Sequence, residues 1–150
     1  MEAMMPDTFE SLNLADARRM IDAGLATAEA AGVRCSIAVV DAGGNLIAFL
    51  RQDGAMTGSA ELAINKAYSA RVFNNSTDVL GKLAQPGAEL FGIQHSHAGK
   101  VVAFGGGSPV RYNASIIGAV GVSGGSVEQD MEIADMAQIA VANGETDHKG

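Results

Sequence analysis

The sequence has no tryptophan, a single cysteine and few aromatic residues, which limits how the chain can be stabilised. Because Cys35 stands alone, no disulfide can form within the chain, and its place before an apolar run is typical of a buried, inert thiol. Aromatic residues make up only 5% of the chain, so the core must be built from Ala, Val, Ile, Leu and Met. We therefore expect one domain of closely packed elements.

Positive charge and long apolar runs are also scarce. The chain has 10 Lys and Arg residues against 17 Asp and Glu, a net charge of −7, and its basic residues are scattered apart from the pair at 18–19. This pattern lacks the basic surface that nucleic acids and anionic lipids require. No apolar run approaches about 18 residues, and the N-terminus does not resemble a signal peptide. We therefore expect a cytoplasmic protein that binds neither nucleic acid nor membranes.

Apolar periodicity predicts helices at both ends of a single domain. We expect an arm at 1–12, one domain at 13–143 and a tail at 144–150. Apolar residues recur at helical spacing between Asn13, a typical N-cap, and Gly32, a typical residue after a helix end. The last helix is apolar nearly all round in its second half, so we expect it to contact its own sheet and another subunit of a homo-oligomer. The predicted helices are 14–31, 60–73, 79–83 and 127–142.

Short apolar runs bounded by turn residues predict five strands. The first two flank the turn DAGGN at 41–45, which is typical of a β-hairpin. Because hairpins connect the strands more often than crossovers do, we expect an antiparallel sheet, with helices on both faces. The fold class is therefore α+β, with three α/β/α layers. The predicted strands are 35–40, 46–50, 89–94, 101–104 and 115–122.

A glycine-rich segment covers residues 101–125, VVAFGGGSPVRYNASIIGAVGVSGG, and contains a predicted loop at 105–113. No Lys-Ser or Lys-Thr follows the glycines, so this is not a phosphate-binding P-loop, and a strand rather than a helix comes next. One interpretation is that backbone amides in the loop bind a carboxylate or another oxyanion. The other is a tight turn between strands. The candidate ligand-binding residues are Gly106, Gly107, Ser108, Pro109 and Arg111.

A second constellation combines Arg51, Asp53 and Lys66. Arg51 closes a predicted strand, and Lys66 lies in a predicted helix on an otherwise apolar stripe. A lysine among apolar neighbours needs a partner or a ligand. The three charges could form the wall of a pocket for a carboxylate or a haem propionate. Alternatively, Asp53 forms a structural ion pair with Lys66 or Arg51.

Two histidines, His95 and His97, form a third candidate site. In an extended segment, side chains at i and i+2 point to the same side, so these imidazoles could be half of a metal site, or one could bind haem iron. A third metal ligand would come from Glu89, Asp53 or a partner subunit. The alternative is a pair of exposed histidines in a turn.

Several motifs occur in an order that resembles the GlcG/HbpS-type family, whose members include haem-binding and haem-degrading proteins. The resemblance spans about residues 12–142 and implies a profilin-like fold, with a five-stranded antiparallel sheet between helices, assembled into oligomers. The same domain forms the C-terminus of PduO-type corrinoid adenosyltransferases. The motifs are VVDAGG at 39–44, R-x-DGA at 51–55, KA at 66–67, GGGSP at 105–109, IGAVGVSGG at 117–125 and EQD at 128–130.

Three functional hypotheses follow. The first is a small oligomeric protein that binds haem, the best-attested ligand of the family, or another small anionic ligand in a pocket walled by Arg51, Asp53, Lys66 and the glycine loop at 105–109. The second is a metal-assisted isomerase, lyase or hydrolase of small organic-acid catabolism. In that enzyme His95 and His97 bind a divalent metal, and Lys66 or Asp53 transfers a proton. The third is a non-catalytic accessory or scaffold subunit.

Overall fold

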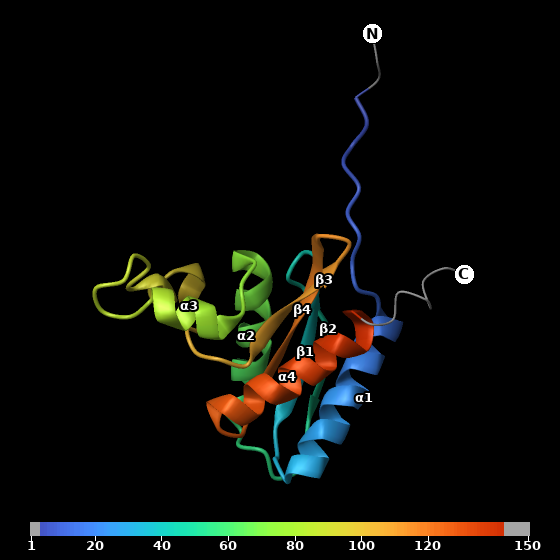
Figure 1. Cartoon of the computed structure of the whole chain (residues 1–150), viewed down its shortest axis with the longest axis vertical. Coiled ribbons are helices and arrows are strands. Elements are labelled where there is room, and N and C mark those ends of the chain that lie inside the picture. Colours follow the sequence, from blue (N-terminus) through green and yellow to red (C-terminus); the bar gives the residue numbers. More distant parts are fainter. Residues whose placement is uncertain (1–3, 143–150) are drawn as a thin grey trace.

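The computed structural model describes residues 4–142, which form four α-helices and a four-stranded antiparallel sheet (Figure 1). The predicted tail, the last residue of the predicted domain and the first three residues of the predicted arm lie outside these residues. The elements are α1 (Leu14–Ala31), β1 (Ser36–Asp41), β2 (Leu46–Arg51), α2 (Ser59–Phe73), α3 (Thr77–Leu83), the 3-10 turns η1 (Ile93–His95) and η2 (His97–Gly99), β3 (Gly107–Tyr112), β4 (Ser115–Ser123) and α4 (Val127–Ala142).

The sheet has the strand order β2-β1-β4-β3, and helices cover both faces. Helices α1 and α4 pack together on one face, and α2 lies against the other (Figure 1). The larger part of the core fills the space between α1, α4 and the sheet. On the α2 side, the core is built mostly from alanines, because Ala63 and Ala67 sit directly over Gly121 of β4. The predicted α+β architecture with helices on both faces is therefore confirmed.

The predicted boundaries of the first helix are confirmed, and the hairpin is present with strand ends within one residue of those predicted. Asn13 accepts a hydrogen bond from the Asp16 amide, Asp16 accepts one from the Asn13 amide, and Gly32 ends α1 in the left-handed conformation with φ 69°. This reciprocal cap satisfies amides that the helix leaves unpaired. Strands β1 and β2 pair antiparallel across the predicted turn.

The prediction of five strands is wrong, because the described residues contain four. Residues 89–94 are not extended, since the chain turns at Gly92, which has φ 90°, and continues into the 3-10 turn η1. Residues 101–104 form no strand ladder, and the Val102 amide instead donates to the Ser69 hydroxyl on α2 at 2.9 Å. The third strand, Gly107–Tyr112, lies inside the predicted loop and pairs with β4.

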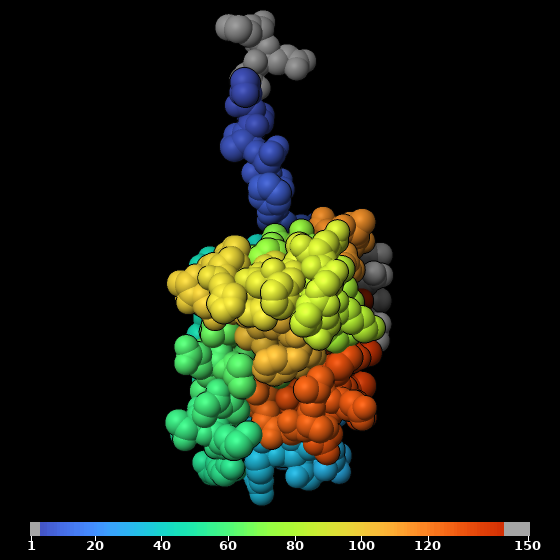
Figure 2. All heavy atoms as spheres, turned by 90° about the vertical axis from the view of Figure 1, so that its left-hand side faces the viewer, coloured from blue at the N-terminus to red at the C-terminus, as the bar shows by residue number. Residues whose placement is uncertain are grey.

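The N-terminal arm extends away from the body of the molecule (Figures 1 and 2). Residues 4–11 are exposed, and Leu12 anchors the arm by burying its side chain and donating its amide to the Ile117 carbonyl at 2.9 Å. Among residues 4–142, no helix has the length and apolar character needed to cross a bilayer.

Candidate functional site

Lys66 is the most unusual residue of the core, because its charged side chain is fully buried. Its Nζ donates to the Val122 carbonyl at 2.9 Å, lies 3.4 Å from Asp130 Oδ2, and sits 4.8 Å from the centre of the Phe104 ring. Burial lowers the pKa of Lys66, and the nearby Asp130 carboxylate opposes that shift only in part. The lysine therefore has the partner that the sequence demanded, but the partner is Asp130 rather than Asp53.

The glycines at 105–107 explain how this ion pair forms. Lys66 belongs to α2 and Asp130 to α4, which lie on opposite faces of the sheet, so the lysine must pass the end of the sheet beside the glycines. Gly106 has φ +128°, and a Cβ on it would lie 2.5 Å from the Val122 oxygen and 2.6 Å from Lys66 Nζ. Any side chain there would displace Lys66. The glycines thus open a passage between the two helical layers.

The backbone of this loop makes hydrogen bonds within the chain. The Gly106 carbonyl accepts from the Val122 amide, and the Gly107 amide donates to Thr77 Oγ1, both at 2.8 Å. The Gly107 amide is therefore not available to an anion in this conformation. We name Lys66, Asp130, Thr77 and the segment Gly105–Gly107 the junction.

Asp130 is the partner of Lys66 that the sequence analysis did not identify, although it ends the EQD motif at 128–130. Its Oδ1 accepts from the Gly125 amide at 2.9 Å while Oδ2 faces Lys66, so one carboxylate holds the start of α4 and the lysine together. The sequence does indicate that Asp130 is buried, because it shares helical spacing with the apolar, buried residues Ile133, Ala137 and Val141. A carboxylate on an apolar stripe needs a partner just as a lysine does.

Cys35 is buried, as predicted, and has no reactive environment. Burial, together with the negative charge of Asp130, raises the pKa of its thiol to about 11. Since the thiolate is the reactive form of cysteine, this thiol is inert near neutral pH.

The structure does not bring Arg51 and Asp53 together with Lys66. Arg51 ends β2 at one edge of the sheet and Asp53 follows it, and both are exposed. Strand β1 separates β2 from β4, which carries the Val122 carbonyl bound by Lys66. At about 4.8 Å per strand, the lateral separation is about 10 Å.

The other predicted ligand-binding residues lie on β3. Ser108 and Pro109 are half-buried strand residues, and Arg111 is exposed with its guanidinium 3.4 Å from the Asn74 carbonyl. Arg111 therefore points toward the end of α2 and not toward Arg51, which lies at the opposite edge of the sheet.

The two histidines are exposed and lie in consecutive 3-10 turns, so the premise of an extended segment is wrong. The His97 ring packs edge-on against Phe73, with centroids 5.2 Å apart, and against Tyr68 at 6.3 Å. In the described part of the chain, no three His, Cys, Asp or Glu residues are grouped to hold a metal ion.

A groove of about 470 Å³ lies beside the junction, between α2 and the segment Val101–Phe104. In Figure 2 this gold segment lies between the green α2 and the orange-red α4. Phe104, which is 43% exposed, links the groove to the junction, because its side chain lines the groove and its ring also covers the Lys66 ammonium. We name this the Phe104 groove; its lining is Gly58, Glu61, Leu62, Asn65, Gln94, Gly99 and Val101–Phe104.

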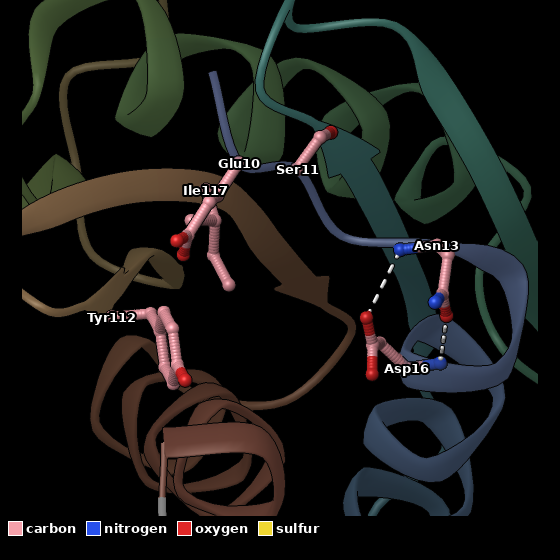
Figure 3. A pocket seen from close by; sticks show the side chains of 6 residues that line it. All are labelled: Glu10, Ser11, Asn13, Asp16, Tyr112 and Ile117. Atoms are coloured by element: carbon pink, nitrogen blue, oxygen red, sulfur yellow. Dashed lines mark hydrogen bonds between the residues drawn. The ribbon is translucent and has the colours of Figure 1, made fainter. Parts of the chain in front are cut away.

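A smaller hollow of about 310 Å³ lies at the start of α1 (Figure 3). Its polar wall is the cap formed by Asn13 and Asp16, and Glu10 adds a second carboxylate. Asp16 is held by Arg19 at 2.8 Å. Two carboxylates in the lining make this hollow unfavourable for an anionic ligand.

Comparisons with known proteins agree over nearly the whole domain. The family model described as "Haem degrading protein HbpS-like" matches residues 12–138. A 15.0 kDa protein of Citrobacter freundii, from the dhaT-dhaS intergenic region, is 42% identical over 127 residues, covering 85% of this chain and 89% of that protein. The corrinoid adenosyltransferase PduO of the same organism is 39% identical over 131 residues, covering 87% of this chain but only 39% of PduO. The crystal structure of a PduOC:heme complex superposes with a TM-score of 0.83 at 38% identity, covering 87% of this chain and 94% of that one.

Proposed function

We propose that this chain, which belongs to the HbpS-like family of haem-degrading proteins, binds haem or a similar small anionic ligand as a homo-oligomer. The observation that carries the proposal is the haem complex of a relative that is 38% identical and has the same fold. The wider activity of PduO is not transferred, because this chain spans only 39% of that protein.

We place the ligand in the Phe104 groove, because it adjoins the junction and offers apolar surface to a flat macrocycle. Leu62, Val101 and Phe104 line it with apolar surface, and its volume of about 470 Å³ falls within the range of about 300–1,000 Å³ typical of ligand sites. Lys100 adjoins the groove in sequence and offers a cation for a propionate. His95 follows the lining residue Gln94 and offers an imidazole, a common ligand of haem iron.

The pocket predicted from the sequence, walled by Arg51, Asp53, Lys66 and the 105–109 loop, is the alternative location. In this structure Lys66 is buried and donates to Val122 and Asp130. Of the three charged residues predicted to line that pocket, only Arg51 and Asp53 are therefore exposed to a ligand. The Phe104 groove ends one residue before the glycine loop, so the two locations differ in the exposed residues that would contact a ligand. Substitution of those residues therefore separates them.

Haemin titration of the purified protein, followed by the Soret band, tests the proposal. We expect saturable binding, and Phe104→Ala should weaken it about tenfold, which corresponds to about 1.4 kcal/mol of lost ring contact. Phe91→Ala is the matched control, because Phe91 is an exposed phenylalanine, at 65%, outside the groove. A shift of the Soret maximum in His95→Ala would identify the imidazole as an iron ligand.

These outcomes distinguish whether the chain binds haem from where on its surface haem binds. No Soret change at micromolar protein would contradict haem binding altogether. Binding that is unchanged in Phe104→Ala but weakened in Arg51→Ala would support the predicted pocket and reject the Phe104 groove.

A further inference from the structure

The Lys66 ammonium has one more donor than it has acceptors. An ammonium carries three N–H groups, and within residues 4–142 Nζ meets two acceptors, the Val122 carbonyl at 2.9 Å and Asp130 Oδ2 at 3.4 Å. The second distance is longer than roughly 2.7–2.9 Å, the range of a close charge-assisted hydrogen bond, so Asp130 holds the ammonium loosely. The Phe104 ring, whose centre is 4.8 Å from Nζ, offers a cation–π contact but no lone pair.

Stability by itself does not require this buried pair of charges. The cost of taking two charges out of water offsets most of their attraction, so well-packed apolar residues of similar size are often equally stable. Desolvated lysines are, by contrast, the ones that serve as nucleophiles and form Schiff bases. Burial lowers the pKa of Lys66, which raises the share of neutral amine near neutral pH. The junction therefore holds an amine that is suited to attack a carbonyl carbon.

The cover over this amine is a side chain that few contacts restrain. Phe104 is 43% exposed, and its ring stands between the Lys66 ammonium and the Phe104 groove. In the described part of the chain, the segment 103–105 makes no hydrogen bond with any other residue. The ring can therefore turn toward solvent without breaking a hydrogen bond, and this rotation joins the groove to the amine.

We propose that Lys66 forms a Schiff base with a small neutral aldehyde or ketone that enters through the Phe104 groove while the Phe104 ring is turned aside. The groove has a volume of about 470 Å³ and offers the side chains of Leu62 and Val101 to the apolar part of that compound. This activity is independent of the haem binding proposed above, although both use the same groove. Loss of one in an experiment therefore leaves the other open to its own test.

The reaction is complete with the groups of the junction and one carbonyl compound. The Lys66 ammonium passes a proton to the Asp130 carboxylate, and the free amine attacks the carbonyl carbon, so that a C–N bond forms and a nitrogen proton moves to the oxygen. Asp130 then returns its proton to the new hydroxyl group, which leaves as water while the C–N bond becomes C=N. The iminium ion keeps the positive charge of the ammonium opposite Asp130. A neutral carbonyl compound thus leaves the buried charges balanced, whereas an anion would not.

Reductive trapping with benzaldehyde tests the proposal on the native chain. Sodium cyanoborohydride supplies the hydride that converts an imine into a stable benzylamine, and peptide mass spectrometry measures the labelled fraction at each lysine. Each pKa unit below the ordinary value raises the share of free amine about tenfold near neutral pH, so Lys66 should be labelled at least about tenfold faster than the exposed Lys82. The rate at Lys66 should also saturate with benzaldehyde. An unlabelled Lys66, or one labelled no faster than Lys82, would overturn the proposal.

Oxygen exchange supplies a second readout, because reversible Schiff base formation replaces the carbonyl oxygen by one from water. In isotopically labelled water, the native protein should accelerate this exchange in benzaldehyde, and Lys66→Met with Asp130→Asn should reduce the accelerated rate at least about tenfold. The matched control is Lys82→Met, which removes an exposed lysine of α3 and should keep the native rate. Circular dichroism confirms that each variant is folded. A folded double variant with the native exchange rate would also overturn the proposal, and trapping on the native chain decides the question if that variant does not fold.

Discussion

The β3 edge and the β2 edge belong to one sheet, but they differ in how firmly the rest of the chain holds them. Near β3, the buried polar groups Lys66, Asp130 and Thr77 each have a partner from another element. A buried polar group without a partner is costly, so these contacts specify a single arrangement of α2, α3 and α4 around the strand. At β2 the side chains are mostly apolar and half exposed, so they constrain the packing of the domain less. The comparison shows that buried polar contacts fix the elements around β3, whereas β2 leaves part of its apolar surface exposed.

The largest expected effect is on the ion pair of the junction. Lys66→Met leaves the Asp130 carboxylate buried without its cation, which should lower the free energy of unfolding by about 3–5 kcal/mol in urea denaturation. Lys66→Met with Asp130→Asn removes the uncompensated charge and keeps an acceptor for the Gly125 amide, so it should recover at least about 1 kcal/mol. Equal stability of the single and double variants would mean that the charge of Asp130 is not what the lysine stabilises.

Substitution of Gly106 is expected to have the next largest effect on the free energy of unfolding. Gly106→Ala forces a Cβ against the Val122 carbonyl and Lys66 Nζ at a positive φ, so we expect a loss of about 2–4 kcal/mol from overpacking and backbone strain. Gly58→Ala is the matched control, because a Cβ on Gly58 meets no atom within 4 Å. The same thermal midpoint for both alanine variants would show that the passage is not tight.

The hydroxyl of Thr77 should have a smaller effect. Thr77→Val keeps the shape of the side chain but leaves the buried Gly107 amide without an acceptor, at a cost of about 1–3 kcal/mol. Thr57→Val, on an exposed threonine, is the control for the change in residue type. An unchanged free energy of unfolding in Thr77→Val would indicate that the start of β3 is held by packing alone.

The pH dependence of stability should report the burial of Lys66 with a modest amplitude. Because burial lowers the pKa of Lys66, the unfolded chain holds more protons between the folded and unfolded pKa values, and the free energy of unfolding rises with pH in that window. Cys35 acts in the opposite sense, since its pKa is raised to about 11. Denaturation from about pH 8 to about pH 10, compared between the native chain and Lys66→Met, isolates the lysine. Parallel pH profiles would contradict its lowered pKa.

At the β2 edge, substitution should hardly change the stability of one copy. Phe49→Thr should alter the free energy of unfolding by less than about 0.5 kcal/mol at concentrations where the chain is monomeric, because the ring is 38% exposed at a sheet edge. A stability loss comparable to that of the junction variants would show that the two edges do not differ in the way described.

The sequence predicted the elements whose signals are local. Helix α1 carries its own cap in Asn13 and Asp16, and the hairpin carries its own turn, so both were correctly placed. Residues 89–94 and 101–104 were misassigned as strands because short apolar runs do not distinguish a strand from an irregular segment, whereas the turn predicted between them is present. The strand at 107–112 was not predicted, because its residues Gly107 and Pro109 are typical of turns. Both residue types also occur in edge strands, where a missing amide proton or side chain is tolerated.

What the sequence by itself determined is the family, the helices, the first hairpin and the requirement that Lys66 have a partner. Only the tertiary structure decided that the partner is Asp130, that the glycines at 105–107 leave room for the lysine, and that Arg51 lies two strands away from the Val122 carbonyl that Lys66 binds. The reason is physical: caps and turns depend on neighbours within a few residues of each other. The partner of a buried charge depends on which layers the fold stacks together, and Lys66 and Asp130 are 64 positions apart in the chain.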